Sequence, residues 1–182
     1  FAAEPTRDAA FLPADGNVIV FERDAGGSEA TRVYRLDLPA GTETPLTEAG
    51  QRCDRGAFNR AGTAVLVTCT RTDRSAADRR APIEVVVELV EVKTGARRAS
   101  VRLPGVGWFP SDLSADERTL IVNRYISAAS TEVHRIDLAS GARTRLLPRD
   151  GEPAQFTLAS GFTADDRHLM VTTDRFGEFR QA

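Results

Sequence analysis

Lysine, histidine, methionine and cysteine are scarce in this 182-residue sequence, and long apolar runs are absent from it. Lys93 is the only lysine among 24 basic residues, the rest are scattered arginines, and the formal net charge is −2. A chain without an excess of positive charge lacks the field that holds a nucleic-acid backbone. We therefore expect no nucleic-acid partner.

The most apolar segment, "APIEVVVELVEV", is interrupted by Glu84, Glu88 and Glu91. A helix needs about 20 mostly apolar residues to cross a bilayer, so we expect no membrane partner. The first residues, "FAAEPTRDAAF", lack an initiator Met and the basic-then-apolar order of a secretory signal. We expect a cytoplasmic location, with the periplasm or secretion as the alternative.

The two cysteines, Cys53 and Cys69, are too few for a disulfide framework. They flank a predicted hairpin, "CDRGAFNRAGTAVLVTC". If Phe58 pairs with Thr63 around the "NRAG" turn, Cys53 falls opposite Thr68, one residue from Cys69. We favour two reduced, half-buried thiols over a cross-strand disulfide. We expect no metal, because two thiols without a nearby histidine do not complete the four-ligand shell of zinc.

A repeated pattern organises the chain. Four segments place an apolar residue before a polar turn and a short β-rich run: "FLPADGNVIVF", "FNRAGTAVLVT", "LSADERTLIVN" and "FTADDRHLMVT". The first three are followed by a second unit, "VYRLDLPAGTETPLT", "LVEVKTGARRASVRL" or "VHRIDLASGARTRLL". Apolar and acidic residues alternate in this unit, as in a strand with one buried face. Its glycines, Gly41, Gly95 and Gly141, are 54 and 46 residues apart and predict another hairpin turn.

Four antiparallel strands repeated at this interval are typical of a β-propeller blade. We therefore predict an all-β protein with about three and a half four-stranded blades, forming one incomplete domain over residues 1–182. The predicted blades cover about 11–48, 57–103, 109–148 and 158–182. Because an unclosed ring exposes apolar faces, we expect a fragment of a larger propeller that is marginally soluble alone.

These repeats resemble those of TolB-like propellers over nearly all of residues 11–182. The stretch "VIVFERDAGGSEATRVYRLDLPAGTETPLT" is more specifically similar to the propeller of serine peptidases of the prolyl oligopeptidase family. The stretches "DLSADERTLIVNRYISAASTEVHRIDLASGARTRLL" and "VTTDRFGEFRQ" resemble later blades of those propellers.

The resemblance implies a propeller that covers an α/β-hydrolase domain with a Ser-Asp-His triad, and that admits short peptides while excluding folded proteins. The expected partners are that hydrolase domain, downstream in the same parent chain, and a short peptide substrate. No triad residue maps onto this chain, so we expect the segment to be non-catalytic and to need no cofactor. The alternative is a stand-alone TolB-like propeller that acts as a protein-interaction scaffold.

Four carboxylates are the candidate site residues for contact with substrate or with the partner domain. They recur in two turns, "RDAGGSE" and "TDRFGE", and they are Asp24, Glu29, Asp174 and Glu178. The simpler interpretation is turn chemistry, in which aspartate binds the backbone N–H groups of the turn.

Other residues are weaker candidates for chemistry. Ser28 lies in "GGSEA", a loose match to a nucleophile elbow, but a predicted strand follows it where an elbow needs a helix. His134 and His168 have no predicted nucleophile or orienting group, so we interpret both as structural or surface histidines.

Overall fold

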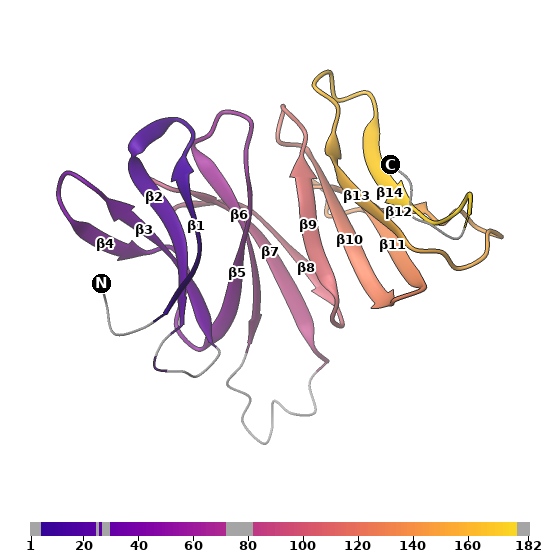
Figure 1. Cartoon of the computed structure of the whole chain (residues 1–182), viewed down its shortest axis with the longest axis horizontal. Coiled ribbons are helices and arrows are strands. Elements are labelled where there is room, and N and C mark those ends of the chain that lie inside the picture. Colours follow the sequence, from indigo (N-terminus) through magenta and orange to yellow (C-terminus); the bar gives the residue numbers. More distant parts are fainter. Residues whose placement is uncertain (1–4, 25, 27–29, 72–81, 178–182) are drawn as a thin grey trace. The chain divides into compact units, whose positions relative to one another are not determined.

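The computed structural model describes residues 5–24, 26, 30–71 and 82–177, which form fourteen β-strands and no helix (Figure 1). The chain divides into two compact units, Phe1–Gly105 and Val106–Ala182. The predicted all-β class and the antiparallel pairing within each repeat are confirmed. Membership of a larger propeller, the number of blades and a single incomplete domain over residues 1–182 stay predictions.

The first unit contains two four-stranded sheets whose strands pair in chain order. The first sheet consists of β1 (Thr6–Leu12), β2 (Asp15–Asp24), β3 (Thr31–Asp37) and β4 (Thr42–Pro45). The second sheet consists of β5 (Gln51–Phe58), β6 (Ala64–Arg71), β7 (Glu84–Glu91) and β8 (Arg97–Pro104). The first sheet thus begins five residues before the predicted blade boundary at residue 11.

The second unit repeats this plan. Its four-stranded sheet, the third of the chain, consists of β9 (Trp108–Leu113), β10 (Thr119–Ser127), β11 (Ser130–Asp137) and β12 (Arg143–Leu147). The fourth sheet pairs β13 (Thr157–Phe162) with β14 (Leu169–Thr173). Residues 178–182, the end of the fourth predicted blade, lie outside the described residues.

The core of the first unit lies between its two sheets, where alternate residues of facing strands meet. Val18, Val20 and Val33 of the first sheet join Val65 and Val67 of the second in one buried cluster. Full burial of one such side chain contributes about 1.5 to 3 kcal/mol. The hydrophobic alternation seen in the sequence therefore holds the two sheets together.

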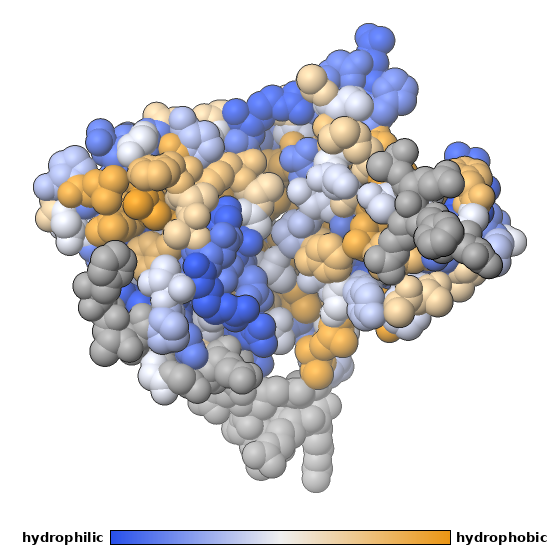
Figure 2. Space-filling view, viewed as in Figure 1, coloured by the Kyte–Doolittle hydropathy of each residue, from blue (hydrophilic) through white to orange (hydrophobic). Residues whose placement is uncertain are grey.

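Hydrophilic side chains gather over β1 and β5 of the first unit (Figure 2). Both are edge strands of their sheets. Arg55 of β5 forms an ion pair with Asp8 of β1, and Arg52 lies 3.9 Å from Asp54. Charged side chains on an edge strand discourage pairing with a foreign strand, so this band protects two exposed edges.

In the second unit, polar side chains connect the third sheet to β13. Asn123 is 1% exposed; its Oδ1 accepts a hydrogen bond from the Ala159 N–H (2.9 Å), and its Nδ2 donates to the Ala159 carbonyl (3.0 Å). Asp112 Oδ2 accepts from the Phe162 N–H (2.8 Å), and Thr131 Oγ1 donates to the Thr157 carbonyl (2.6 Å). The two sheets are therefore held in register by directional bonds as well as by apolar packing.

The turn between the first two strands of a sheet has the same conformation in three repeats. Gly62, Glu117 and Asp166 occupy the same place in the repeat and have φ values of 68°, 57° and 58°. A left-handed backbone costs a non-glycine residue about 1 to 2 kcal/mol. Asp166 gains a compensating contact, because its Oδ2 accepts a hydrogen bond from the Ala115 N–H (2.8 Å).

We expect Glu117→Gly to stabilise the second unit by about 0.5 to 1 kcal/mol, because relief of the left-handed strain exceeds the added entropy of the unfolded chain. The midpoint of urea unfolding measures this change. Gly62→Ala is the control with the opposite expected sign and should lower the midpoint of unfolding. A Cβ there would meet the Pro13 Cβ at 2.7 Å and the Ala14 nitrogen at 2.8 Å. An unchanged or lower midpoint for Glu117→Gly would contradict the prediction.

Candidate functional site

Two of the four candidate carboxylates lie in described residues. Asp24 ends β2, pairs across the hairpin with Thr31 and is buried. Asp174 follows β14; its Oδ1 accepts a hydrogen bond from the Phe156 N–H (3.0 Å), and its own N–H donates to the Phe156 carbonyl (3.1 Å). Asp174 therefore closes the open end of the β13–β14 hairpin through a residue 18 positions away, which lies outside the "TDRFGE" turn.

The other two carboxylates, Glu29 and Glu178, lie outside the described residues, as does Ser28. Asp24 and Asp174 belong to different units. A role of these four carboxylates in binding substrate or a partner domain therefore stays a prediction.

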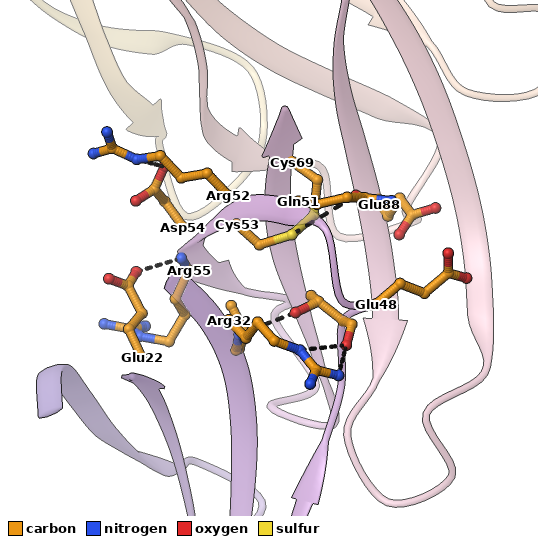
Figure 3. The surroundings of a disulfide bond; sticks show 12 residues. Glu22, Arg32, Glu48, Gln51, Arg52, Cys53, Asp54, Arg55, Cys69 and Glu88 are labelled. Atoms are coloured by element: carbon orange, nitrogen blue, oxygen red, sulfur yellow. Dashed lines mark hydrogen bonds and ion pairs between the residues drawn. A yellow bond between two sulfur atoms is a disulfide. The ribbon is translucent and has the colours of Figure 1, made fainter. Parts of the chain in front are cut away.

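Cys53 and Cys69 form a disulfide across β5 and β6, with their Cα atoms 4.2 Å apart (Figure 3). The expectation of two reduced thiols was wrong, because the turn pairing differs from the predicted one by two residues and a bulge in β5 then shifts the register by one. Phe58 pairs with Val65 instead of Thr63, and a register shift between Arg55 and Phe58 then brings Cys53 directly opposite Cys69. A bulge places two residues of one strand against one of its partner, and no feature of the sequence had indicated it.

The disulfide belongs to a position that recurs in three sheets, which we call the cross-strand clamp. The clamps are the facing pairs Cys53–Cys69, Trp108–Arg124 and Thr157–Thr173, each joining the first two strands of its sheet. In the third sheet the Arg124 guanidinium lies 5.1 Å from the Trp108 ring centroid. In the fourth sheet the two threonine hydroxyls are 2.7 Å apart. Three different kinds of side-chain interaction therefore connect the first two strands of a sheet at the same position of the repeat.

The disulfide belongs to the apolar core of the first unit, and several polar side chains lie around it (Figure 3). Glu22 of the first sheet accepts a hydrogen bond from the Arg55 N–H (2.5 Å). Burial raises the pKa of Glu22 above its usual value, against the opposing effect of this hydrogen bond. Arg32 donates to the Thr47 carbonyl at 2.6 and 3.2 Å. The Glu22–Arg55 bond links the two sheets, and the Arg32–Thr47 bonds fix the segment that connects β4 to β5.

A hollow of about 530 Å³ lies on the second sheet beside Cys69. Its lining includes two arginines that already have carboxylate partners. Arg97 contacts Glu88 (3.0 Å) and Glu48 (3.4 Å), and Arg102 contacts Glu84 (3.4 Å). Partly exposed pairs of this kind contribute about 0 to 1 kcal/mol each. The hollow is therefore polar and largely charge-compensated, and it offers no clear set of converging groups for one ligand.

Glu132 is the centre of a charged cluster on the third sheet that sequence reasoning missed. Its carboxylate contacts His134 Nε2 (3.0 Å), Arg124 (3.5 Å) and Arg145 (3.5 Å). Burial alone would raise the pKa of Glu132, but His134 and Arg124 hold it below its usual value. The available signal was the spacing of Glu132 and His134, because residues two apart on a strand share one face.

His134 is a structural residue in this cluster, as expected. Its ring lies edge-on to Trp108, with centroids 5.0 Å apart, and it is 6% exposed. Burial lowers the pKa of His134 and outweighs the opposing effect of Glu132. Nδ1 is buried without a hydrogen-bond partner among the described residues, so the ring is accommodated in its neutral form.

We expect the second unit to lose stability as the pH falls from 7.5 to 5.5. The folded pKa of His134 is depressed, so the unfolded chain binds a proton first, near pH 6.5, and acid favours unfolding. The loss at pH 5.5 is at most about 1.4 kcal/mol, the value of one pH unit. Urea unfolding at both pH values measures it. His134→Gln should abolish this pH dependence, whereas His168→Gln, at an exposed site, should leave it unchanged. If the free energy of unfolding changed equally with pH in both variants, the prediction would be refuted.

The described residues contain no group of three or more His, Cys, Asp or Glu side chains that could hold a metal ion. Nor does that part of the chain contain a helix long and apolar enough to cross a membrane.

Comparison with known proteins finds similarity at the level of the fold. No protein-family model and no curated protein matches the chain. An oligogalacturonate lyase in complex with manganese is similar over 96% of this chain, with a TM-score of 0.68 and 13% identity. A prolyl endopeptidase is similar over 93% (TM-score 0.58, 14% identity), and the acylaminoacyl peptidase of Pyrococcus horikoshii over 97% (TM-score 0.55, 12% identity).

The chain spans 46%, 26% and 31% of the lengths of these three proteins. The resemblance to the propeller region of prolyl oligopeptidase family peptidases is thus confirmed in its fold. At this level of identity the chain shares the fold of these enzymes, and its own activity is a separate question.

Proposed function

We propose that this chain is the propeller portion of a serine peptidase that hydrolyses peptide bonds in short peptides. In this proposal it restricts access of substrate to an α/β-hydrolase domain of the same parent polypeptide. The observation that carries the proposal is the match of more than nine-tenths of the chain to about a quarter to a third of two peptidases. A segment of that size leaves room in those enzymes for a separate catalytic domain.

The chain itself is non-catalytic in this proposal. The strand β3 begins at Thr31, so the residues after Ser28 do not continue into the helix that a nucleophile elbow needs. His134 Nε2 is engaged by Glu132 and does not serve a hydroxyl nucleophile. The carboxylates Asp24, Glu29, Asp174 and Glu178 are the proposed contacts to substrate or to the hydrolase domain.

The test uses the natural full-length protein and a fluorophosphonate probe that labels active serines. We expect hydrolysis of short chromogenic peptides, no cleavage of a folded protein, and a labelled serine outside residues 1–182. Ser28→Ala should change the rate less than twofold, and residues 1–182 alone should be inactive. Labelling of Ser28, or activity of the isolated chain that Ser28→Ala abolishes, would overturn the proposal.

Absence of both hydrolysis and labelling would favour the alternative, a stand-alone TolB-like propeller that serves as an interaction scaffold. The two alternatives share this fold, so the fold does not separate them. A G-x-S-x-G motif after Ala182, followed by Asp and then His, would favour the peptidase.

We also propose that the protein works in an oxidising compartment, the periplasm or outside the cell, instead of the cytoplasm that the sequence had favoured. The Cys53–Cys69 disulfide supports this choice, because such bonds persist in oxidising surroundings and are rare in the cytosol. Alkylation of free thiols during lysis of the source cells, followed by mass spectrometry, tests it. We expect both cysteines to be protected from alkylation; two alkylated cysteines would contradict the proposal.

A further inference from the structure

One position of the repeat is buried in three sheets and exposed in the fourth. Val20, Leu66, Ile121 and Met170 occupy the same place in the second strand of their sheets, because each lies four residues after the equivalent turn residue, which is Gly16, Gly62, Glu117 or Asp166. Val20 is 0% exposed, and Leu66 and Ile121 are 1% exposed. Met170 is 55% exposed. An apolar side chain at this position is therefore covered in every sheet except the fourth.

The residue two places further along makes a specific bond to the next sheet. In the first unit, Glu22 accepts a hydrogen bond from the N–H of Arg55 on β5 (2.5 Å). In the second unit, Asn123 accepts one from the N–H of Ala159 on β13 (2.9 Å). Arg55 and Ala159 are equivalent, each three residues before a repeat phenylalanine, so one contact recurs between two pairs of sheets. The equivalent residue on β14 is Thr172.

The alternation of β14 shows which face of the fourth sheet carries Met170 and Thr172. Leu169 and Val171 pack against the core that the fourth sheet shares with the third. Side chains alternate along a strand, so Met170 and Thr172 lie on the opposite face. This face, which we call the open face, corresponds to the face of the first sheet that covers β5 and to the face of the third sheet that covers β13.

We propose that the open face is the docking surface for a further four-stranded antiparallel sheet of the same repeat, supplied by the parent polypeptide. The first strand of that sheet donates a main-chain N–H to Thr172 Oγ1 and covers Met170. Continuity with two interfaces within this chain argues for this occupant, because each combines a buried apolar residue with a side-chain acceptor for a strand N–H. The proposal does not depend on the peptidase assignment, since a scaffold propeller would need the same surface.

The test places a thiol at the centre of the open face by Met170→Cys. Cys53 and Cys69 are bonded and buried, so the new thiol reacts alone with a fluorescent maleimide. We expect fast labelling in the 182-residue chain and labelling at least 20-fold slower in the natural full-length protein. Thr44→Cys, exposed on β4, is the matched control and should label equally fast in both.

Equal labelling rates for the Met170→Cys variant of the two proteins would overturn the proposal. Protection that develops in the 182-residue chain as its concentration rises would also overturn it, because a second copy would then be the occupant. A supporting measurement is the melting temperature of the full-length protein, which should fall on Met170→Glu and stay unchanged on Thr44→Glu.

Discussion

Replacing Cys53 and Cys69 together by alanine should lower the free energy of unfolding of the first unit by about 3 kcal/mol. The disulfide joins residues 16 apart, and loop-closure entropy for a loop of this size amounts to about 3 kcal/mol. Both side chains also lie in the apolar core, at 0% and 3% exposed, so their truncation removes packing as well. Urea unfolding of the oxidised protein and of the double variant measures the difference.

The matched control is the clamp of the fourth sheet, where Thr157→Val with Thr173→Val removes the hydroxyl–hydroxyl hydrogen bond and the part-buried bond from the Arg175 N–H to Thr173 Oγ1 (3.2 Å). Replacing both partners of a hydrogen bond by apolar groups of similar shape is nearly neutral, so we expect a loss below about 1 kcal/mol. Reduction of the wild-type protein should reproduce most of the effect of the double alanine variant. A loss below about 1 kcal/mol on removing the disulfide would show that β5 is held by its other contacts.

Asn123→Leu should destabilise the second unit by about 2 kcal/mol, the second large effect that the structure predicts. The substitution conserves side-chain size but leaves the buried Ala159 N–H without its acceptor, while the Ala159 carbonyl keeps the hydrogen bond from Ser111 Oγ (2.8 Å). Each unsatisfied buried group costs about 1 to 3 kcal/mol. Urea unfolding gives the total, and hydrogen exchange at the Ala159 amide reports the local loss.

Glu22→Gln is the matched control in the first unit. It keeps the oxygen that accepts the Arg55 N–H and removes a carboxylate whose pKa is raised by burial. We expect it to be neutral or slightly stabilising at pH 7. If Asn123→Leu were also neutral, the Asn123 hydrogen bonds would add no net stability to the contact between the third and fourth sheets.

The repeat made most of the fold predictable from the sequence. Its apolar alternation and its recurring turns predicted antiparallel strands in the correct order, because both signals depend only on neighbouring residues. The β5 bulge was not predictable in this way. It shifts the partner of Cys53 by one residue, and the choice between two thiols and a disulfide depended on that shift.

The candidate site was less accessible to sequence reasoning than the fold. The turn pattern singled out Asp174, but its carboxylate accepts from the Phe156 N–H, 18 residues away and outside the turn, a contact that the sequence did not indicate. The cluster around Glu132 draws its partners from β10, β11 and β12, and the sequence does not indicate which arginines of three strands converge on one carboxylate. Pairings between strands of known register would have been needed to find it.

The cross-strand clamps suggest a way to tune the sheets one at a time. A thiol pair, an aromatic–cation pair and a hydroxyl pair fill equivalent positions, so the backbone there accepts side chains of very different size and charge. Each pair responds to a different solution condition, and a reductant acts on the pair of the second sheet alone. Cysteines at positions 157 and 173 in place of Thr157 and Thr173 would make the stability of the fourth sheet redox-dependent. The clamp residues of this repeat could thus be exchanged to suit a chosen environment without altering its turns or its core.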